Sequence, residues 1–283
     1  MGCGATSSDG ETAETTTASA KRIVSLAGDI TETLFALDQG DKIVGIDITS
    51  TYPAEKVKEL PRLGHVSQLN VEAVLQLQPD LIFVGESNKS QEAIQQLEKA
   101  GIKIQTVPSN YTLEQPLQLI DSISMLLNCS EKAIALKESI QADYTQFEAL
   151  KAKVENPKKV LFIYSRGKGS MMVGGKGTSA DAIIQLAGAV NAAETEEFQA
   201  LSAEGLIQTQ PEVFLFFESG LKSLGGPEGL LEVPGVVATP AGKQQNIITM
   251  DGLKLLGFTP RLGKALIELH QQIYAPKATL TAN

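Results

Sequence analysis

The sequence predicts an α/β protein of two similar lobes, each built on a parallel sheet, joined by one long helix. Three observations support this fold class. A fifteen-residue stretch occurs twice, at residues 69–83 and 201–215. Short apolar strands alternate with amphipathic helices in both halves of the chain, an order typical of parallel sheets covered on both faces. A helical pattern without Gly or Pro fills residues 130–154, between the two halves.

The repeat predicts one helix-to-strand unit in each lobe. The copies, LNVEAVLQLQPDLIF and LSAEGLIQTQPEVFL, are identical at five of fifteen positions. In each copy a short polar residue, Asn70 or Ser202, is expected to cap a two-turn helix. Gln-Pro followed by an acid is expected to end that helix before a buried strand. The copies lie nearly half the chain apart, which is too far for a solenoid, so we expect two lobes.

The first lobe is predicted over residues 21–128. After a strand at 23–27, Asp29 with Glu32 three positions later predicts a helix that begins with a capping box. A strand at 42–46 leads into the loop DITSTYP, where Tyr52 precedes a proline and is therefore held extended. Further elements are expected in this order: the first repeat unit, a helix at 90–100, a strand at 103–107 and a helix at 112–127.

The connecting segment is predicted over residues 129–156 and the second lobe over 157–283. The helix at 130–154 would be about 37 Å long, at 1.5 Å per residue, close to the width of a small domain. We therefore interpret it as a rigid strut. The second lobe is expected to contain a strand at 159–164, a loop at 165–177, a helix capped by Thr178, the second repeat unit, a helical turn at 227–231, a strand at 246–250 and a helix at 260–274.

Composition excludes several classes of function. The net charge of −9 and a pI near 4.9 argue against nucleic-acid binding, because neutralising phosphates needs clustered Lys and Arg. The sequence has no run of eighteen apolar residues, so no transmembrane helix is predicted. Its two cysteines, Cys3 and Cys129, provide no disulfide framework.

The N-terminus predicts a tether. Residues 1–20 are small and polar after Cys3 and cannot bury enough apolar surface to fold. A cysteine before a Ser/Thr/Glu-rich leash is how a mature bacterial lipoprotein begins, so we expect a lipid on Cys3. Two other interpretations exist: a chance cysteine in a disordered terminus, and N-myristoylation of MGCGAT. The rest of the sequence does not resemble a cytosolic eukaryotic protein.

Motifs for catalysis are weak. The Gly-rich loop SRGKGSMMVGGKG lacks the spacing of a P-loop; it is either an anion-binding loop near a helix N-terminus or a flexible turn. His65 lies in a loop and either faces a cleft or is an ordinary surface histidine. His270 is expected to be solvated or to cap the last helix. No nucleophile motif or metal-spaced Cys/His set occurs, which favours a binding protein over an enzyme.

The two repeat glutamates allow two interpretations. Glu72 and Glu204 each lie in the first turn of a predicted helix, where the helix dipole favours a carboxylate. That is a sufficient structural reason for both residues. A symmetric pair, one per lobe, is also what a two-point ionic docking site would need.

Four stretches together resemble a known family. They are RIVSLAGDITETLFALDQGDKIVGIDITSTYP, VGGKGTSADAIIQLAGAVN, GPEGLLEVPGVVATPAG and FTPR. They are similar to the haem-binding substrate-binding proteins of bacterial ABC importers, within the wider class that also carries vitamin B12 and siderophores. The resemblance spans residues 22–274. It implies two Rossmann-like lobes joined by one long helix, with the ligand, haem b, in the cleft between them.

The same resemblance implies roles for individual residues. Tyr52 is implied as the axial ligand of ferric haem iron, because a phenolate is a hard anionic donor suited to Fe(III); the alternative is a tyrosine packed at a lobe edge. Arg166, Lys168 and Arg261 are candidates to pair with the haem propionates, and His65 is a further cleft candidate. Glu72 and Glu204 are implied to dock onto arginines of the membrane permease.

We therefore predict an extracytoplasmic, monomeric haem carrier that delivers its ligand to an ABC importer. It would lie in the periplasm or on the outer face of the cytoplasmic membrane, with a lipid anchor at Cys3. A corrinoid or iron–siderophore carrier of the same fold is the first alternative and would not need Tyr52. A tetrapyrrole chelatase is the second, and would need a catalytic histidine and an acid facing each other across the cleft.

Overall fold

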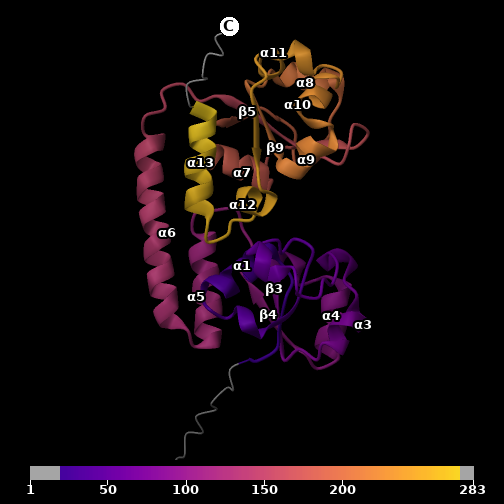
Figure 1. The fold of residues 1–283 in the computed structure, drawn as a ribbon, viewed down its shortest axis with the longest axis vertical. Coiled ribbons are helices and arrows are strands. Elements are labelled where there is room, and N and C mark those ends of the chain that lie inside the picture. The colour runs from indigo at the N-terminus through magenta and orange to yellow at the C-terminus, as the bar shows by residue number, and fades with distance from the viewer. Residues whose placement is uncertain (1–19, 275–283) are drawn as a thin grey trace, which may run out of the picture.

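The structure, a computed structural model, describes residues 20–274 and contains two α/β lobes stacked along one long helix (Figure 1). The predicted tether up to residue 19, with Cys3, lies outside the described residues. In the first lobe, four strands form a sheet of order β2-β1-β3-β4 in which every pair is parallel. These strands are β1 (Ile23–Ser25), β2 (Ile43–Ile46), β3 (Leu81–Gly85) and β4 (Lys103–Val107).

The first lobe contains its predicted helices in the predicted order, together with one short helix after Pro53 that was not predicted. They are α1 (Gly28–Ala36), α2 (Ala54–Val57), α3 (Val71–Gln76), α4 (Glu92–Lys99) and α5 (Gln115–Leu127). The predicted capping box of α1 is wrong. Helix α1 begins after Ala27 with no side-chain cap, and Glu32 forms an ion pair instead of a capping box. The helix expected at 90–100 begins at Glu92, after Gln91, whose side chain makes no capping bond.

The second lobe contains a six-stranded sheet of order β10-β9-β5-β6-β8, with β7 paired to β5. Strands β10, β9, β5 and β7 pair in parallel, whereas β6 is antiparallel to both β5 and β8. The strands are β5 (Lys159–Ser165), β6 (Met171–Gly174), β7 (Val190–Asn191), β8 (Phe198–Ala200), β9 (Val213–Phe217) and β10 (Ile247–Met250). The predicted loop at 165–177 therefore contains a strand, and the sheet is mostly rather than wholly parallel.

The helices of the second lobe cover both faces of this sheet. They are α7 (Ser179–Leu186), α8 (Ala203–Thr209), α9 (Glu218–Ser223), α10 (Gly226–Leu231), α11 (Pro240–Lys243), α12 (Gly252–Leu256) and α13 (Leu262–Tyr274). Thr178 caps α7 as predicted, since its side chain accepts a hydrogen bond from the Asp181 amide. His270, expected to be solvated or capping, is instead buried, and its Nδ1 lies 2.9 Å from the Ala187 carbonyl oxygen.

The sequence repeat is a structural repeat. Asn70 and Ser202 each accept the amide hydrogen bond that caps α3 or α8, at 3.0 Å in both cases. Each helix is followed by a glutamine with positive φ directly before the proline, 46° at Gln78 and 44° at Gln210. The acid after the proline then binds the start of the neighbouring strand: Asp80 accepts from the Lys21 and Arg22 amides, and Glu212 accepts from the Lys159 amide.

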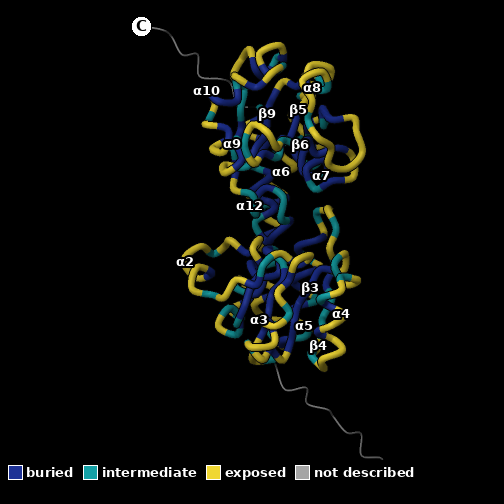
Figure 2. The backbone as a smooth tube through the Cα atoms, turned by 90° about the vertical axis from the view of Figure 1, so that its right-hand side faces the viewer, coloured by how far each residue is buried: buried dark blue, intermediate teal, exposed yellow. Residues whose placement is uncertain are grey.

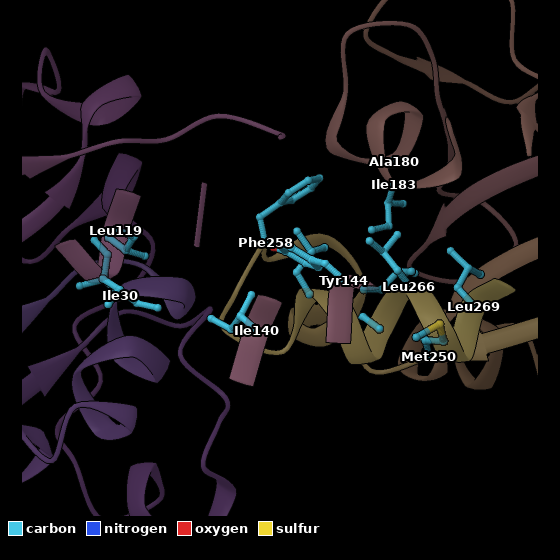
Figure 3. Close-up of a cluster of buried hydrophobic side chains, with 14 of the residues drawn as sticks. Ile30, Leu119, Ile140, Tyr144, Ala180, Ile183, Met250, Phe258, Leu266 and Leu269 are labelled. Carbon is cyan, nitrogen blue, oxygen red and sulfur yellow. The ribbon is translucent and has the colours of Figure 1, made fainter. Parts of the chain in front are cut away.

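Helix α6 (Ser130–Lys151) joins the lobes. It packs against α5 of the first lobe and α13 of the second (Figure 1). One hydrophobic cluster runs from Ile30 and Leu119 through Ile140 and Phe258 into Leu266 of the second lobe (Figure 3). Because this buried cluster is continuous across the lobe boundary, a wide opening of the lobes would expose apolar surface. Figure 2 shows the buried strands inside each lobe. The other face of each sheet packs into a cluster of its own, around Val24 and Ile82 in the first lobe and around Leu161 and Phe214 in the second.

Candidate functional site

A cavity of about 600 Å³ lies between the lobes. It is lined by residues that follow β1, β2, β9 and β10, so the carboxyl ends of strands from both sheets meet there. Ligands of open α/β sheets bind at this edge. We call it the cleft cavity, and its lining residues are Ala27, Gly28, Asp29, Thr49, Thr51, Phe217, Ser219, Asp251, Gly252, Leu253, Leu256 and Gly257.

The start of α1 forms the first-lobe wall of the cleft cavity. The Gly28 amide donates to Thr49 Oγ1 at 2.9 Å, and Thr49 Oγ1 in turn donates to Asp47 at 2.6 Å. A Cβ on Gly28 would lie 2.6 Å from the Thr49 carbonyl oxygen and 2.5 Å from Leu253 Cδ1 of the other lobe. Only glycine therefore allows this close approach of the two lobes.

Asp29 is an acid held in the cleft wall. Burial raises the pKa of Asp29 to about 7, and the charge of Asp47 adds to the effect. The hydrogen bond from the Ile30 amide to Asp29 Oδ1, at 2.9 Å, opposes the rise without cancelling it. Near neutral pH this carboxyl therefore exchanges between its neutral and charged forms inside the cleft.

Replacing Asp29 with Asn is expected to remove a pH dependence of stability. A carboxyl whose pKa is raised on folding binds more protons in the folded state. The free energy of unfolding therefore falls as the pH rises from about 4, where the unfolded chain loses this proton, to about 7, where the folded protein loses it. Above pH 7 the free energy of unfolding of Asp29→Asn should therefore exceed that of the wild type by roughly 1 kcal/mol or more, since one pKa unit corresponds to about 1.4 kcal/mol. Urea unfolding at pH 5 and pH 8 measures this difference. An equal wild-type-to-variant difference at the two pH values would contradict it.

Tyr52 and Arg261 meet at the boundary between the lobes. The Arg261 guanidinium carbon lies 3.7 Å from the centroid of the Tyr52 ring, a cation–π contact. The peptide bond between Tyr52 and Pro53 is cis. Tyr52 remains 40% exposed, so the aromatic ring is covered on one face by the guanidinium while the residue stays accessible. Tyr52 and Arg261, which the sequence analysis gives as separate candidates, are therefore in direct contact.

Arg261 is fixed by Glu32 of the first lobe. Its Nε and Nη2 donate to the two carboxylate oxygens of Glu32 at 2.8 and 2.7 Å, and Glu32 is only 3% exposed. Burial alone would lower the pKa of Arg261, but the hydrogen bonds and charge of Glu32 outweigh it and raise that pKa above its ordinary value. This bidentate pair ties the lobes together and sets the guanidinium plane against Tyr52.

Tyr52 lines a second cavity of about 260 Å³, bounded by α1, α6 and the start of α13. We call it the Tyr52 cavity. Its lining residues are Glu32, Phe35, Ala36, Tyr52, Pro53, Leu136, Ser139, Ile140, Asp143, Pro260, Arg261 and Lys264. Thr49 and Thr51, from the same loop as Tyr52, line the cleft cavity. The loop after β2 therefore contributes to both cavities.

The other predicted cleft residues have partners elsewhere. Arg166 donates from Nε to the Tyr164 hydroxyl at 2.6 Å, and Lys168 forms an exposed ion pair with Glu232. His65 caps a 3-10 turn, Val66–Gln68, by accepting from the Ser67 amide. None of Arg166, Lys168 and His65 is among the described residues that line either cavity.

Glu72 and Glu204 are both exposed, each in the first turn of its capped helix. Helices α3 and α8 lie on the side of the molecule away from α6 (Figures 1 and 2). One helical turn after each glutamate is an exposed aliphatic residue: Leu75, 40% exposed, and Ile207, 41% exposed. The repeat therefore places the same pair, an acid and an aliphatic side chain, on one face of each lobe.

Sequence reasoning missed Asp29 as a cleft residue, Glu32 as the partner of Arg261, and Lys264. Asp29 and Glu32 were assigned to a capping box, which explained them locally. The position of Asp29 directly after the first strand was the available signal, because strand carboxyl ends line the cleft.

Within residues 20–274 no helix is long and apolar enough to cross a membrane, and no cluster of three or more His, Cys, Asp or Glu side chains is placed to hold a metal ion.

Solved structures with this fold include two haem-binding proteins. The periplasmic heme-binding protein RhuT from Roseiflexus sp. RS-1 is 39% identical, with a TM-score of 0.85 over 90% of this chain and 98% of RhuT. The periplasmic heme-binding protein BhuT, solved in complex with two hemes, is 34% identical, with a TM-score of 0.83 over 89% of this chain and 97% of BhuT.

Curated relatives that are similar in sequence include a substrate-binding lipoprotein and a vitamin B12-binding protein. The uncharacterized ABC transporter substrate-binding lipoprotein YvrC of Bacillus subtilis is 29% identical over 90% of this chain and 80% of YvrC. A vitamin B12-binding protein of Vibrio campbellii is 29% identical over 69% of this chain and 70% of that protein. The profile of the family described as periplasmic binding protein matches residues 23–252. The chain belongs to the periplasmic binding protein family, a family of substrate-binding proteins and not of enzymes.

Proposed function

We propose that this protein captures ferric haem between its lobes and delivers it to the membrane subunits of an ABC importer. The observation that supports haem most directly is the accessible Tyr52 ring held against Arg261 at the lobe boundary. A phenolate oxygen is a hard donor that suits Fe(III), and a neighbouring guanidinium stabilises the negative charge of the ligating oxygen. RhuT and BhuT, solved haem-binding proteins of this fold, support the same choice of ligand.

The cleft cavity supplies the apolar surface that a porphyrin needs. Its walls include Phe217, Leu253 and Leu256, together with Gly252 and Gly257. A flat aromatic ligand gains from burial against such side chains at about 25 cal/mol per Å² of apolar surface. Tyr52 belongs to the loop after β2, and other residues of this loop line the cleft cavity. A porphyrin whose iron is bound at Tyr52 could therefore extend toward the cleft cavity.

A corrinoid carrier is the second candidate, supported by the vitamin B12-binding relative. Haem is favoured because a corrinoid would not need a tyrosine at the Tyr52 position. A chelatase receives no support from the histidines. His65 caps a turn, and His270 is buried against Ala187, so neither is among the described residues that line the cleft cavity.

Titration of the purified protein with ferric haem and, separately, with cyanocobalamin tests the proposed function. We expect saturable haem binding, with the visible spectrum of a high-spin ferric phenolate complex, and cobalamin binding weaker by at least about a hundredfold. Intrinsic tyrosine fluorescence provides a second readout. Equal affinity for both ligands, or a haem spectrum identical to that of free haem, would contradict the proposal.

Docking onto the importer is assigned to α3 and α8. The exposed carboxylates of Glu72 and Glu204 offer one anionic point on each lobe, and Leu75 and Ile207 offer an apolar contact beside each. Because the two patches are copies of one repeat, they fit a partner that presents the same basic and apolar surface twice. A permease built from two identical subunits has this property.

The place of action is outside the cytoplasm. YvrC is described as a substrate-binding lipoprotein, and Cys3 is followed by a polar tether. A lipid on Cys3 would hold the protein at the outer face of the cytoplasmic membrane, and a single lipid chain gives modest, reversible anchoring.

A further inference from the structure

Two of the three cations expected to pair with the haem propionates are absent from both cavities. Arg166 and Lys168 are engaged with Tyr164 and Glu232, away from both cavities. The described residues that line the cleft cavity include two acids, Asp29 and Asp251, and no base. A ligand with two propionates therefore finds no cationic partner on the cleft side of Tyr52.

The Tyr52 cavity holds two cations with different commitments. Arg261 makes two hydrogen bonds to Glu32, so its charge is already balanced. Lys264 lies three residues later, in the first turn of α13, and is exposed. Among residues 20–274 its ammonium group has no hydrogen-bond or ion-pair partner. Asp143, across the cavity on α6, is not within the 4.0 Å that defines an ion pair with Lys264.

We propose that Lys264 binds a carboxylate of the ligand whose iron is held by Tyr52. This inference rests on the proposed haem function. It follows from position and charge, because Lys264 lines the same cavity as Tyr52 and is the cation there whose charge no described residue neutralises. An ammonium is a compact charge on a flexible stem, so it can follow a propionate that is itself flexible. Asp143 opposes this binding, since it places a like charge beside the ligand carboxylate.

The two lining residues give opposite expectations. Lys264→Gln keeps a polar side chain, shorter by one atom, but removes its charge, and should weaken haem binding about five- to tenfold at low ionic strength. Asp143→Asn should strengthen haem binding about two- to fivefold, because it removes the competing carboxylate. Lys243→Gln is the matched control: Lys243 is an exposed lysine of α11, and its loss changes the net charge equally without touching the cavity.

Ferric protoporphyrin dimethyl ester separates carboxylate recognition from other effects, because its propionates carry no charge. Lys264→Gln and Asp143→Asn should bind this ester as the wild type does, and thermal melting should show that both variants are folded. Haem affinity unchanged in Lys264→Gln, or equal losses for haem and the ester, would overturn the assignment of Lys264. Failure of the proposed function looks different: the wild type itself would then show no phenolate-type haem spectrum.

Discussion

Replacing Tyr52 with Phe is expected to abolish the phenolate-type spectrum of the ferric haem complex and to weaken haem binding by at least about a hundredfold. The substitution removes only the donor oxygen. The ring that contacts Arg261, and with it the Arg261–Glu32 pair, is preserved, so the loss reports the iron bond and not a collapse of the lobe boundary. Removing groups that merely orient a metal ligand costs ten- to a hundredfold, and the ligand itself should cost at least as much. Visible absorption titration measures both effects.

Tyr111 provides the matched control. It is an exposed tyrosine of the first lobe, 49% accessible, whose ring lies 5.4 Å from that of Phe258 near the lobe boundary. Tyr111→Phe removes a phenol of similar exposure, and its haem spectrum and affinity should equal those of the wild type. Haem binding that survives intact in Tyr52→Phe would remove Tyr52 from the iron, and the corrinoid alternative would then gain weight.

Local signals in the sequence were sufficient to predict the framework. The caps at Asn70, Ser202 and Thr178 depend on residues three positions away, and the structure confirms all three. The repeat also predicted two equivalent units, because a helix, a Gln-Pro stop and a buried strand are each encoded within a few residues. Helix α6 was predictable for the same reason, since it contains neither Gly nor Pro.

Pairings between distant residues were not predictable. Glu32 and Arg261 are separated by 229 positions, and Glu32 had a local explanation in a capping box that proved wrong. Strand β6 was hidden in a Gly-rich segment because its identity depends on antiparallel pairing with β5 and β8. His270 was missed for a different reason: it shares the buried face of α13 with Leu266 and Ile273, and this spacing could have shown that it packs inside.

Replacing both repeat glutamates, in Glu72→Gln/Glu204→Gln, is expected to leave haem affinity unchanged and to reduce haem uptake through the importer at least about tenfold. Both carboxylates are exposed and absent from the two cavities, so the ligand site should not sense their loss. Charges at an interface mainly set the association rate and its dependence on salt. The variant should therefore lose most of its transport at low ionic strength, where the wild type is fastest. Uptake of labelled haem by proteoliposomes containing the importer measures this loss.

The control variant is Glu92→Gln/Glu131→Gln. Both of these acids are exposed in the first turn of a helix, α4 or α6, and Glu92 accepts a hydrogen bond from Gln96 as Glu204 does from Gln208. The control therefore removes the same charge and the same helix-dipole contribution from other surfaces. If it slows uptake as much as the Glu72/Glu204 variant does, net charge and not the repeat determines docking.

The aliphatic half of each patch has a separate expected effect. Leu75→Ser and Ile207→Ser remove apolar contacts but no charge, so they should raise the dissociation rate from the importer and leave the salt dependence of association as in the wild type. Surface plasmon resonance on the importer in nanodiscs separates the two rates. Because the patches are copies, the two single variants should be similar in size. A large effect at Ile207 with none at Leu75 would show that the partner contacts one lobe only, against docking on both copies of the repeat.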